Sequence, residues 1–353
     1  MTIEISKAAL LADLNLVKPA VSSQAFVPSL THFLFTGTGV VGYNDLSAIE
    51  VKSDVDMCCC VPADLLIKTL NSLSSDKVAI TEDAGQITLK SGNAKVKIPT
   101  LPQSDFPFSF PYGEDEAGYE LNDDILEGIE KCLAGVGTDP THPAQMGVTI
   151  YPGEVATIYS TDNYTMSKFE TETELEFPGD SPVILPTFFC TQLLALAKAF
   201  KSEVVSLYVP EGAVVASFGD QAFLYTKMLV ALEPLDFPKI FKKHVNPNMI
   251  DFHELPAGLD EAVARAEIVM ASDLDKIVQL KISRSTLHVS ASSALGESYD
   301  TFKLSAPDAE MFSVDPVLLS RALKSSRKMG LSENALVLSN SSYIHLIAHV
   351  RSK

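Results

Sequence analysis

The stretch VILPTFFCTQLLALAKAF, residues 183–200, joins a short apolar segment, a proline and an amphipathic segment. Proline suits the first turn of a helix, because its φ angle is preset and its missing N–H would have no acceptor inside the helix. Leu193 and Leu196 follow at the spacing of one helix face. The stretch therefore predicts a strand that meets Pro186 and a helix over 187–200.

This strand–proline–helix unit occurs three times in the chain. The two further copies are residues 58–61, Pro62 and 63–73, and residues 312–315, Pro316 and 317–327. A second unit, a short alternating strand before an amphipathic helix, also occurs three times, with helices predicted over 7–17, 123–136 and 258–270. The starts of the second unit lie roughly 115–135 residues apart, which indicates three internal repeats of one module.

The repeats predict three tandem domains. The first two end alike, in Asp105-Phe106-Pro107 and in Asp236-Phe237-Pro238. Linkers are predicted over 111–118 and 242–248, and the domains are predicted to comprise residues 1–116, 117–245 and 246–353. Each domain has two predicted helices among strand-like segments, which indicates an α+β fold with the helices on one face of an antiparallel sheet.

Composition and charge describe an ordinary globular chain. The 353 residues include 27 Lys and Arg against 45 Asp and Glu, a net charge of −18, and 46% of them are hydrophobic. This excludes a surface that is basic all over, although the sum leaves room for a basic lining inside an acidic exterior. No apolar run approaches the ~18 residues of a membrane span. The N-terminus lacks a secretory pattern and five cysteines make no disulfide framework, so a cytoplasmic protein is expected.

Repeated sheets raise the question of how their edges are used. Natural proteins cover free strand edges or pair them. Similar domains in a row can join edge to edge, and two chains that meet head to tail can close into a ring. The predicted helices carry many of the basic residues, including the run from Arg321 to Lys328. These charges fit two interpretations: solvated outer helix faces, or a mildly positive lining for a polyanion.

The order and spacing of several segments resemble the bacterial DNA polymerase III beta subunit family, the beta sliding clamps. The resemblance covers essentially the whole chain. The segments that carry it are VPADL (61–65), SG (91–92), TLPQSDFP (100–107), STDNYTM (160–166), VILP (183–186), FGD (218–220), FP (237–238) and ARAEIV (264–269).

The resemblance implies three tandem DNA-clamp domains in each chain, which form half of a closed ring. The ring would be a head-to-tail homodimer whose helices face inward around double-stranded DNA, without sequence specificity. Such a protein would be a processivity factor in DNA replication, without enzymatic activity, cofactor or metal. It would tether the replicative DNA polymerase, and both the polymerase and the clamp loader would bind through short apolar peptide motifs.

The resemblance also implies three sets of site residues. The DNA-binding set is Lys198, Lys201, Arg265, Arg321 and Lys324. The dimer-interface set is Phe106, Ile268 and Val269. The partner-peptide pocket is expected to contain Thr161, Asn163, Tyr164, Met166, Pro238, Ile347 and Val350. The alternatives for the three sets are a solvated helix face, domain core and packing at a domain joint.

The chain departs from the family pattern at places that bear on these sites. Gln24 stands where a basic residue is expected in the first domain. The pocket segment 163–166 and the C-terminal segment 348–353 also differ from the family's. Pocket specificity and one DNA contact are therefore left open by the sequence.

A glycine motif supports a different class of function. Residues 37–42 match the dinucleotide-binding pattern Gly-x-Gly-x-x-Gly, which needs a helix to begin there. Residues 43–51 instead alternate like a strand, so a turn is predicted. The alternatives to a clamp are a nucleotide-dependent oxidoreductase that uses the Gly37–Gly42 loop, and a repeat-built scaffold that binds only proteins.

Other reactive residues do not form a recognisable site. Cys58, Cys59 and Cys60 would alternate between the faces of a strand without a Cys-x-x-Cys pair, and buried structural cysteines are predicted. His345 and His349 could share a strand face, but neither has an acid or a cysteine beside it. No catalytic arrangement and no metal site are expected.

Overall fold

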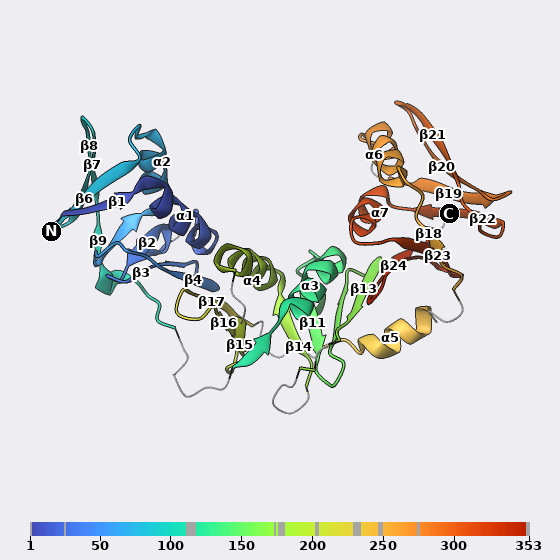
Figure 1. The fold of residues 1–353 in the computed structure, drawn as a ribbon, viewed down its shortest axis with the longest axis horizontal. Coiled ribbons are helices and arrows are strands. Elements are labelled where there is room, and N and C mark those ends of the chain that lie inside the picture. The colour runs from blue at the N-terminus through green and yellow to red at the C-terminus, as the bar shows by residue number, and fades with distance from the viewer. Residues whose placement is uncertain are drawn as a thin grey trace. The chain divides into compact units, whose positions relative to one another are not determined.

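The computed structural model describes residues 2–24, 26–110, 118–172, 174–175, 181–201, 205–228, 234–245, 250–273 and 276–350 (Figure 1). The chain forms two compact units: unit 1 is Met1–Asn122 with Thr191–Val230, and unit 2 is Asp123–Cys190 with Ala231–Lys353. Of the predicted linker 111–118 only Gly118 is described. The predicted linker 242–248 is wrong at its start, because residues 242–244 belong to a helix, and residues 246–248 lie outside the described residues. In the described ranges no helix is long and apolar enough to cross a membrane.

The described residues contain seven α-helices, and six of them match the predicted ones. The helices are α1 (Lys7–Val17), α2 (Ala63–Ser72), α3 (Asp123–Cys132), α4 (Thr187–Phe200), α5 (Phe237–His244), α6 (Leu259–Val269) and α7 (Pro316–Leu323). Of the three prolines in the strand–proline–helix units, only Pro316 lies inside a helix, whereas Pro62 and Pro186 are the last residues of the preceding strands. Helix α5 was not predicted from the sequence, because its eight residues fall in the segment interpreted as the end of a repeat.

Unit 1 contains two antiparallel sheets. The four-stranded sheet has the order β1 (Thr2–Ser6), β6 (Lys77–Asp83), β7 (Gln86–Ser91), β8 (Ala94–Pro99). The nine-stranded sheet has the order β10 (Tyr119–Leu121), β15 (Val205–Tyr208), β16 (Ala213–Ser217), β17 (Ala222–Lys227), β4 (Ser47–Lys52), β3 (Gly39–Tyr43), β2 (His32–Phe35), β5 (Cys59–Pro62), β9 (Leu101–Pro102). Helix α1 packs on β3 and β4 of the larger sheet.

Unit 2 repeats this plan. Its eight-stranded sheet has the order β14 (Val183–Pro186), β11 (Gly147–Tyr151), β12 (Thr157–Thr161), β13 (Thr165–Glu170), β25 (Tyr343–Ala348), β24 (Ala335–Asn340), β23 (Lys328–Leu331), β18 (His253–Glu254). Its four-stranded sheet has the order β21 (Gly296–Lys303), β20 (Thr286–Ser293), β19 (Val278–Ser283), β22 (Ala309–Val314). Helices α6 and α7 lie side by side in this unit (Figure 1).

Each large sheet joins strands from two sequence repeats. Strand β17 pairs with β4, and Leu224 lies opposite Ile49. Strand β13 pairs with β25 in the same antiparallel manner, and Ser167 lies opposite His345. The predicted α+β fold with helices packed on antiparallel sheets is confirmed. The division at 116 and 245 stays a prediction, because the compact units follow the continuous sheets and cut the second repeat in two.

The eight-stranded sheet of unit 2 is covered on both faces. Leu336, Leu338 and Ile347 belong to the apolar core that includes residues of α6 and α7. Their neighbours along β24 and β25 belong to a second cluster with Phe237 and Phe241 of α5. Because successive strand residues point to opposite faces, α5 covers the face opposite to α7. Figure 1 shows α5 apart from the α6–α7 pair.

In unit 1 a segment without regular structure takes the place that α5 has in unit 2. Phe106 is buried in a cluster with residues of β2, β3 and β16. Phe108 stacks on Tyr43, with ring centroids 4.4 Å apart, and also contacts Phe110 and Tyr225. The repeated Asp-Phe-Pro motif therefore places one phenylalanine, Phe106 or Phe237, against each large sheet.

The glycine motif lies in a β-hairpin. Gly37 has φ +89° in the turn, and Gly42 lies within β3. A Cβ on Gly42 would lie 2.8 Å from side-chain atoms of Val17 and Val21, so the glycine allows α1 to pack closely on the strand. The chain continues into β4 without starting a helix, and the backbone N–H cradle of a dinucleotide site is not formed there.

The three adjacent cysteines differ in exposure. Cys59 and Cys60 are buried, which confirms the prediction for these two, and burial raises the pKa of Cys59 to about 12 and that of Cys60 to about 11. The prediction was wrong for Cys58, which is exposed because it precedes the first residue of β5.

His345 lies in a buried polar cluster within the eight-stranded sheet. Its Nδ1 is 2.8 Å from the hydroxyl of Ser167 and 3.2 Å from that of Tyr343, and its Nε2 has no hydrogen-bond partner among the described residues. Complete burial lowers the pKa of His345 to about 3. His349 instead accepts a hydrogen bond from the Ser313 N–H, so the two histidines do not form one site.

The low pKa of His345 predicts a pH-dependent stability. In the unfolded chain His345 is protonated below its ordinary pKa of 6.5. In the folded chain it stays neutral until the pH approaches about 3. Stability should therefore fall as the pH drops through this window, by up to about 1.4 kcal/mol per pH unit. Glutamine does not titrate, so His345→Gln removes this pH-dependent loss of stability. From pH ~6.5 to pH ~5 the free energy of unfolding of the wild type should therefore fall by about 2 kcal/mol more than that of the variant.

Urea unfolding at several pH values measures this difference. His142→Gln, which changes an exposed histidine, is the control and should follow the wild-type profile more closely. If the unfolding free energies of wild type and His345→Gln change in parallel with pH, His345 is not the cause of the pH dependence.

Candidate functional site

Unit 2 contains a pocket on the face of the large sheet that α5 covers. Its volume is about 290 Å³. The lining comes from the β12–β13 turn, from β24 and β25, and from α5 and the residues just before it. The lining residues are Gln145, Thr161, Asn163, Tyr164, Thr165, Met166, Leu235, Ile240, His244, Asn334, Ala335, Leu346 and Ala348. The pocket is thus an apolar cleft with amide and hydroxyl groups around it, a combination that suits a short apolar peptide.

The turn between β12 and β13 is held by its own side chains. The Asp162 carboxylate accepts hydrogen bonds from the backbone N–H of Tyr164 (2.9 Å) and Thr165 (2.6 Å) and from the Thr165 hydroxyl. Asn163 has φ +72°, a left-handed conformation that asparagine tolerates better than most residues. Tyr164 next to it is 70% exposed. The sequence TDNYT therefore forms a fixed turn that presents an aromatic ring at the pocket.

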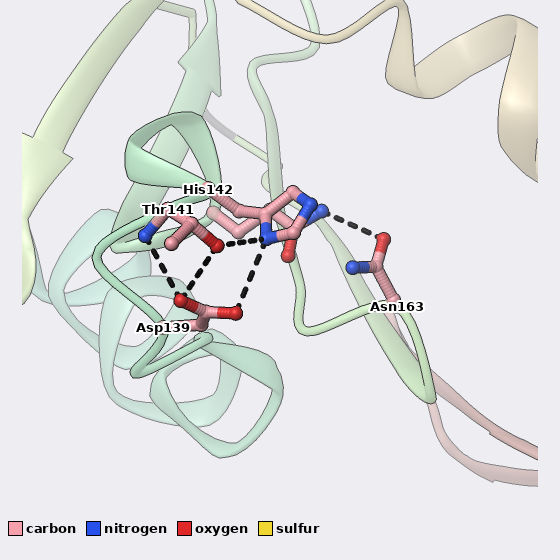
Figure 2. Close-up of polar contacts among 5 residues, drawn as sticks. Asp139, Thr141, His142 and Asn163 are labelled. Atoms are coloured by element: carbon pink, nitrogen blue, oxygen red, sulfur yellow. Dashed lines mark hydrogen bonds and ion pairs between the residues drawn. The ribbon is translucent and has the colours of Figure 1, made fainter.

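A second loop supports this turn. The side-chain amide Nε2 of Gln145 donates a 2.7 Å hydrogen bond to Oδ1 of the Asn163 side chain. In the loop before Gln145, the Asp139 carboxylate accepts hydrogen bonds from the backbone N–H and the hydroxyl of Thr141 and lies 3.3 Å from His142 Nδ1 (Figure 2). The backbone N–H of Thr141 is the main cause that lowers the pKa of Asp139. The loop is thereby held as a separate hydrogen-bonded turn beside Asn163.

The structure brings together four of the seven residues expected in the partner pocket: Thr161, Asn163, Tyr164 and Met166. Ile347 points into the opposite core, because it alternates with Leu346 and Ala348, which line the pocket. Pro238 and Val350 are also outside the lining, although Pro238 belongs to α5, which supplies Ile240 and His244.

The contribution of α5 to the pocket was not predicted from the sequence. The signal was present, because Phe237, Ile240, Phe241 and His244 recur at helical spacing after an Asp-Phe-Pro start. Asp236 caps the helix by accepting a hydrogen bond from the Lys239 N–H at 3.1 Å.

The five residues expected to bind DNA are all exposed, but one of them already forms an ion pair within the chain. Arg265 makes a bidentate pair with Asp300 of β21, at 2.7 Å and 3.3 Å. Lys198 and Lys201 at the end of α4, and Arg321 and Lys324 at the end of α7, form no ion pair with any described residue. These four cations are available to a polyanion, whereas Arg265 would have to exchange its partner first.

The three residues expected at a dimer interface also differ in exposure. Ile268 is 72% exposed on α6, and Val269 beside it is partly exposed. Phe106 is only 8% exposed and packs within unit 1. Of the three, Ile268 therefore offers the largest apolar surface to another chain.

Two sheet edges accompany these residues. Strand β8 ends the four-stranded sheet of unit 1, and β21 ends the four-stranded sheet of unit 2. Tyr299 on β21 is 65% exposed. Neither edge has a further strand partner among the described residues, so each can accept another strand.

No group of three or more His, Cys, Asp or Glu side chains in the described part of the chain is arranged to hold a metal ion.

Comparison of the sequence with known proteins gives a partial match. No family model matches the chain. The chain is 25% identical over 167 residues to the beta sliding clamp of Streptomyces coelicolor, which covers 47% of this chain and 44% of that relative. The match thus spans less than half of the relative's length.

Comparison of the structure gives matches over the full length of the chain. The sliding clamp of Bartonella birtlesii, solved with griselimycin bound, aligns with a TM-score of 0.85 at 18% identity, and both chains are covered completely. The DNA polymerase III beta subunit of Thermotoga maritima (TM-score 0.83, 15% identity) and the sliding clamp of Bacillus subtilis (0.80, 18%) are also covered completely. The resemblance noted in the sequence is confirmed at the level of the fold: this chain folds as the bacterial DNA polymerase III beta subunits do.

Proposed function

We propose that this protein is a DNA sliding clamp, a processivity factor that encircles duplex DNA and tethers a replicative polymerase. The observation that carries the proposal is the likeness of the whole fold to sliding clamps, with complete coverage of both chains. The role is mechanical, and the proposal assigns no catalytic group and no cofactor.

The ring would form from two chains that meet head to tail. Strand β8 is one edge of the four-stranded sheet in unit 1, and β21 is one edge of the four-stranded sheet in unit 2. Antiparallel pairing of β8 with the β21 of a second copy would extend both sheets and remove both edges. Exposed Ile268 and Val269 on α6 would add apolar contact to this junction.

Charge supports a lining for DNA. Duplex DNA has one negative charge per ~1.7 Å of its axis. Lys198, Lys201, Arg321 and Lys324, which form no ion pair with a described residue, would attract the DNA backbone. The net charge of −18 would discourage DNA from binding elsewhere on the surface. Attraction by a few exposed cations is weak, so the duplex can slide while the closed ring prevents its escape.

The pocket of unit 2 would receive the partners. Its apolar lining, with Leu346, Met166 and Ile240, can take up leucine-like or aromatic side chains. Gln145 and Asn163 use one side-chain amide atom each on one another, and their remaining amide atoms can bind the peptide backbone. We assign this pocket to short apolar peptide motifs of a polymerase and a clamp loader.

Topological retention is the direct test of the ring. Linear duplex DNA attached to a bead by one end is incubated with the protein, which can thread onto the free end, and that end is then blocked with streptavidin. The protein should remain bound in about 0.5 M NaCl, where ion pairs are screened, because escape then requires the ring to open. Cutting the blocked DNA should release the protein as fast as the protein leaves DNA that was never blocked.

The control is the same DNA without streptavidin, which should lose the protein in high salt. Loss from doubly blocked DNA would exclude a closed ring and leave a protein-only scaffold. Binding of a dinucleotide in calorimetry would support the oxidoreductase instead.

A charge at Ile268 should weaken the dimer. Ile268→Asp places a carboxylate in a proposed apolar junction, and the dissociation constant should rise roughly tenfold or more. Sedimentation equilibrium measures the change. Val155→Asp alters an exposed valine elsewhere in unit 2 and should leave the dimer intact. Equal dissociation constants for both variants would remove Ile268 from the interface.

Filling the pocket should block peptide binding without harming the fold. Ala348 is exposed and lines the pocket, so Ala348→Trp occupies its volume and should weaken binding of a fluorescent leucine- and phenylalanine-containing peptide roughly tenfold. The matched control is Val350→Trp, two residues further along the chain and outside the lining. Equal loss in both variants would indicate a general disturbance of the strand end and not a filled pocket.

A further inference from the structure

One wall of the pocket carries a ridge of positive charge that the apolar lining does not explain. Helix α5 contains Lys239, Lys242 and Lys243 followed by His244, and all four are exposed. His244 and Ile240 line the pocket. In a chain of net charge −18, this is a local excess of cations beside a proposed binding site.

The helical period separates the three lysines. At about 100° per residue, Lys243 lies about 60° around the helix axis from Ile240, and Lys239 lies about 100° from it. Lys239 and Lys243 are four residues apart, so they lie one above the other along the same side. Lys242 is about 160° from Ile240 and points away from the pocket wall. We call Lys239 and Lys243, which share one side of α5, the basic ridge.

No acidic side chain among the described residues forms an ion pair with the basic ridge. Neither lysine forms an ion pair with any described residue, and none of the described lining residues is an aspartate or a glutamate. Asp162 and Asp236 belong to neighbouring elements, but each has an oxygen bound to backbone N–H groups of its own turn. Glu333 precedes the lining residue Asn334 and is not itself in the lining.

The helix itself does not require both lysines. Lys243 is in the last turn, where a cation is favourable to the helix dipole. Lys239 is in the first turn, where a cation is unfavourable, and two lysines at this spacing repel one another. The arrangement therefore costs the free helix stability, and an anionic partner on that side would offset the cost.

We propose that the basic ridge selects partner peptides that carry acidic side chains next to their apolar anchors. This inference rests on the proposed function of the pocket as a peptide site. The apolar anchors would enter the cleft between α5 and the β12–β13 turn, and the carboxylates would lie along Lys239 and Lys243. The attraction is a matter of specificity and of association rate more than of total affinity.

Matched peptides test the proposal. The probes are a fluorescent peptide with leucine and phenylalanine anchors, two versions of it with a pair of aspartates before or after the anchors, and neutral twins with asparagines. At low salt one acidic version should bind the intact protein roughly three- to tenfold more tightly than its twin, and about 0.5 M NaCl should remove the difference. Lys239→Gln with Lys243→Gln should also remove it and leave the affinity for the neutral twin unchanged. Lys242→Gln, on the other side of the helix, should preserve the preference.

The outcomes separate this inference from the proposed function. Equal affinity for acidic peptides and neutral twins overturns the basic ridge and leaves the pocket standing. Absence of binding by every peptide overturns the pocket, and the inference with it. A double variant that binds all peptides as the wild type does, but leaves unblocked DNA faster at low salt, assigns the two lysines to DNA and also overturns the inference.

Discussion

Antiparallel pairing between edge strands of successive repeats is the constraint on which the rest of the structure depends. A short module of two helices on a sheet exposes strand edges that must find partners. In each compact unit one such edge is satisfied within the chain, by β17 with β4 and by β13 with β25. The hydrogen bonds of these ladders make one continuous sheet out of two repeats. The units that result follow the sheets and not the sequence repeats.

A continuous sheet has two faces, and a different segment of the chain covers each of them. One face is covered by helices, as Leu338 and Ile347 show in their core with α6 and α7. The other face needs a cover too, and the segments that begin with Asp-Phe-Pro provide it through Phe106 and Phe237. In unit 2 this cover is a helix that does not fill the whole face. The space that remains beside Met166 and Leu346 is the pocket.

Charge is distributed in a way that composition conceals. Several helix cations are neutralised locally, such as Lys18 by Asp64, Lys131 by Glu127 and Arg265 by Asp300. Other helix cations form no ion pair with a described residue, among them Lys198 and Lys324 at helix ends and Lys239 and Lys243 on α5. An acidic protein can thus present small positive surfaces to anionic partners. The proposed lining for DNA and the basic ridge are two such surfaces, on different elements.

The sequence by itself determined the repeats, six of the seven helices, the α+β class and the resemblance to sliding clamps. These depend on local signals: prolines before helices, alternation in strands and helical spacing of leucines. It also indicated four of the pocket residues, because they are neighbours in one turn. Only the tertiary structure decided which of Leu346 and Ile347 faces the pocket, since a shift of one residue reverses the face of a strand. Burial of Phe106, pairing of Arg265 with Asp300 and the role of α5 likewise depend on contacts between residues far apart in the chain, and local patterns do not encode such contacts.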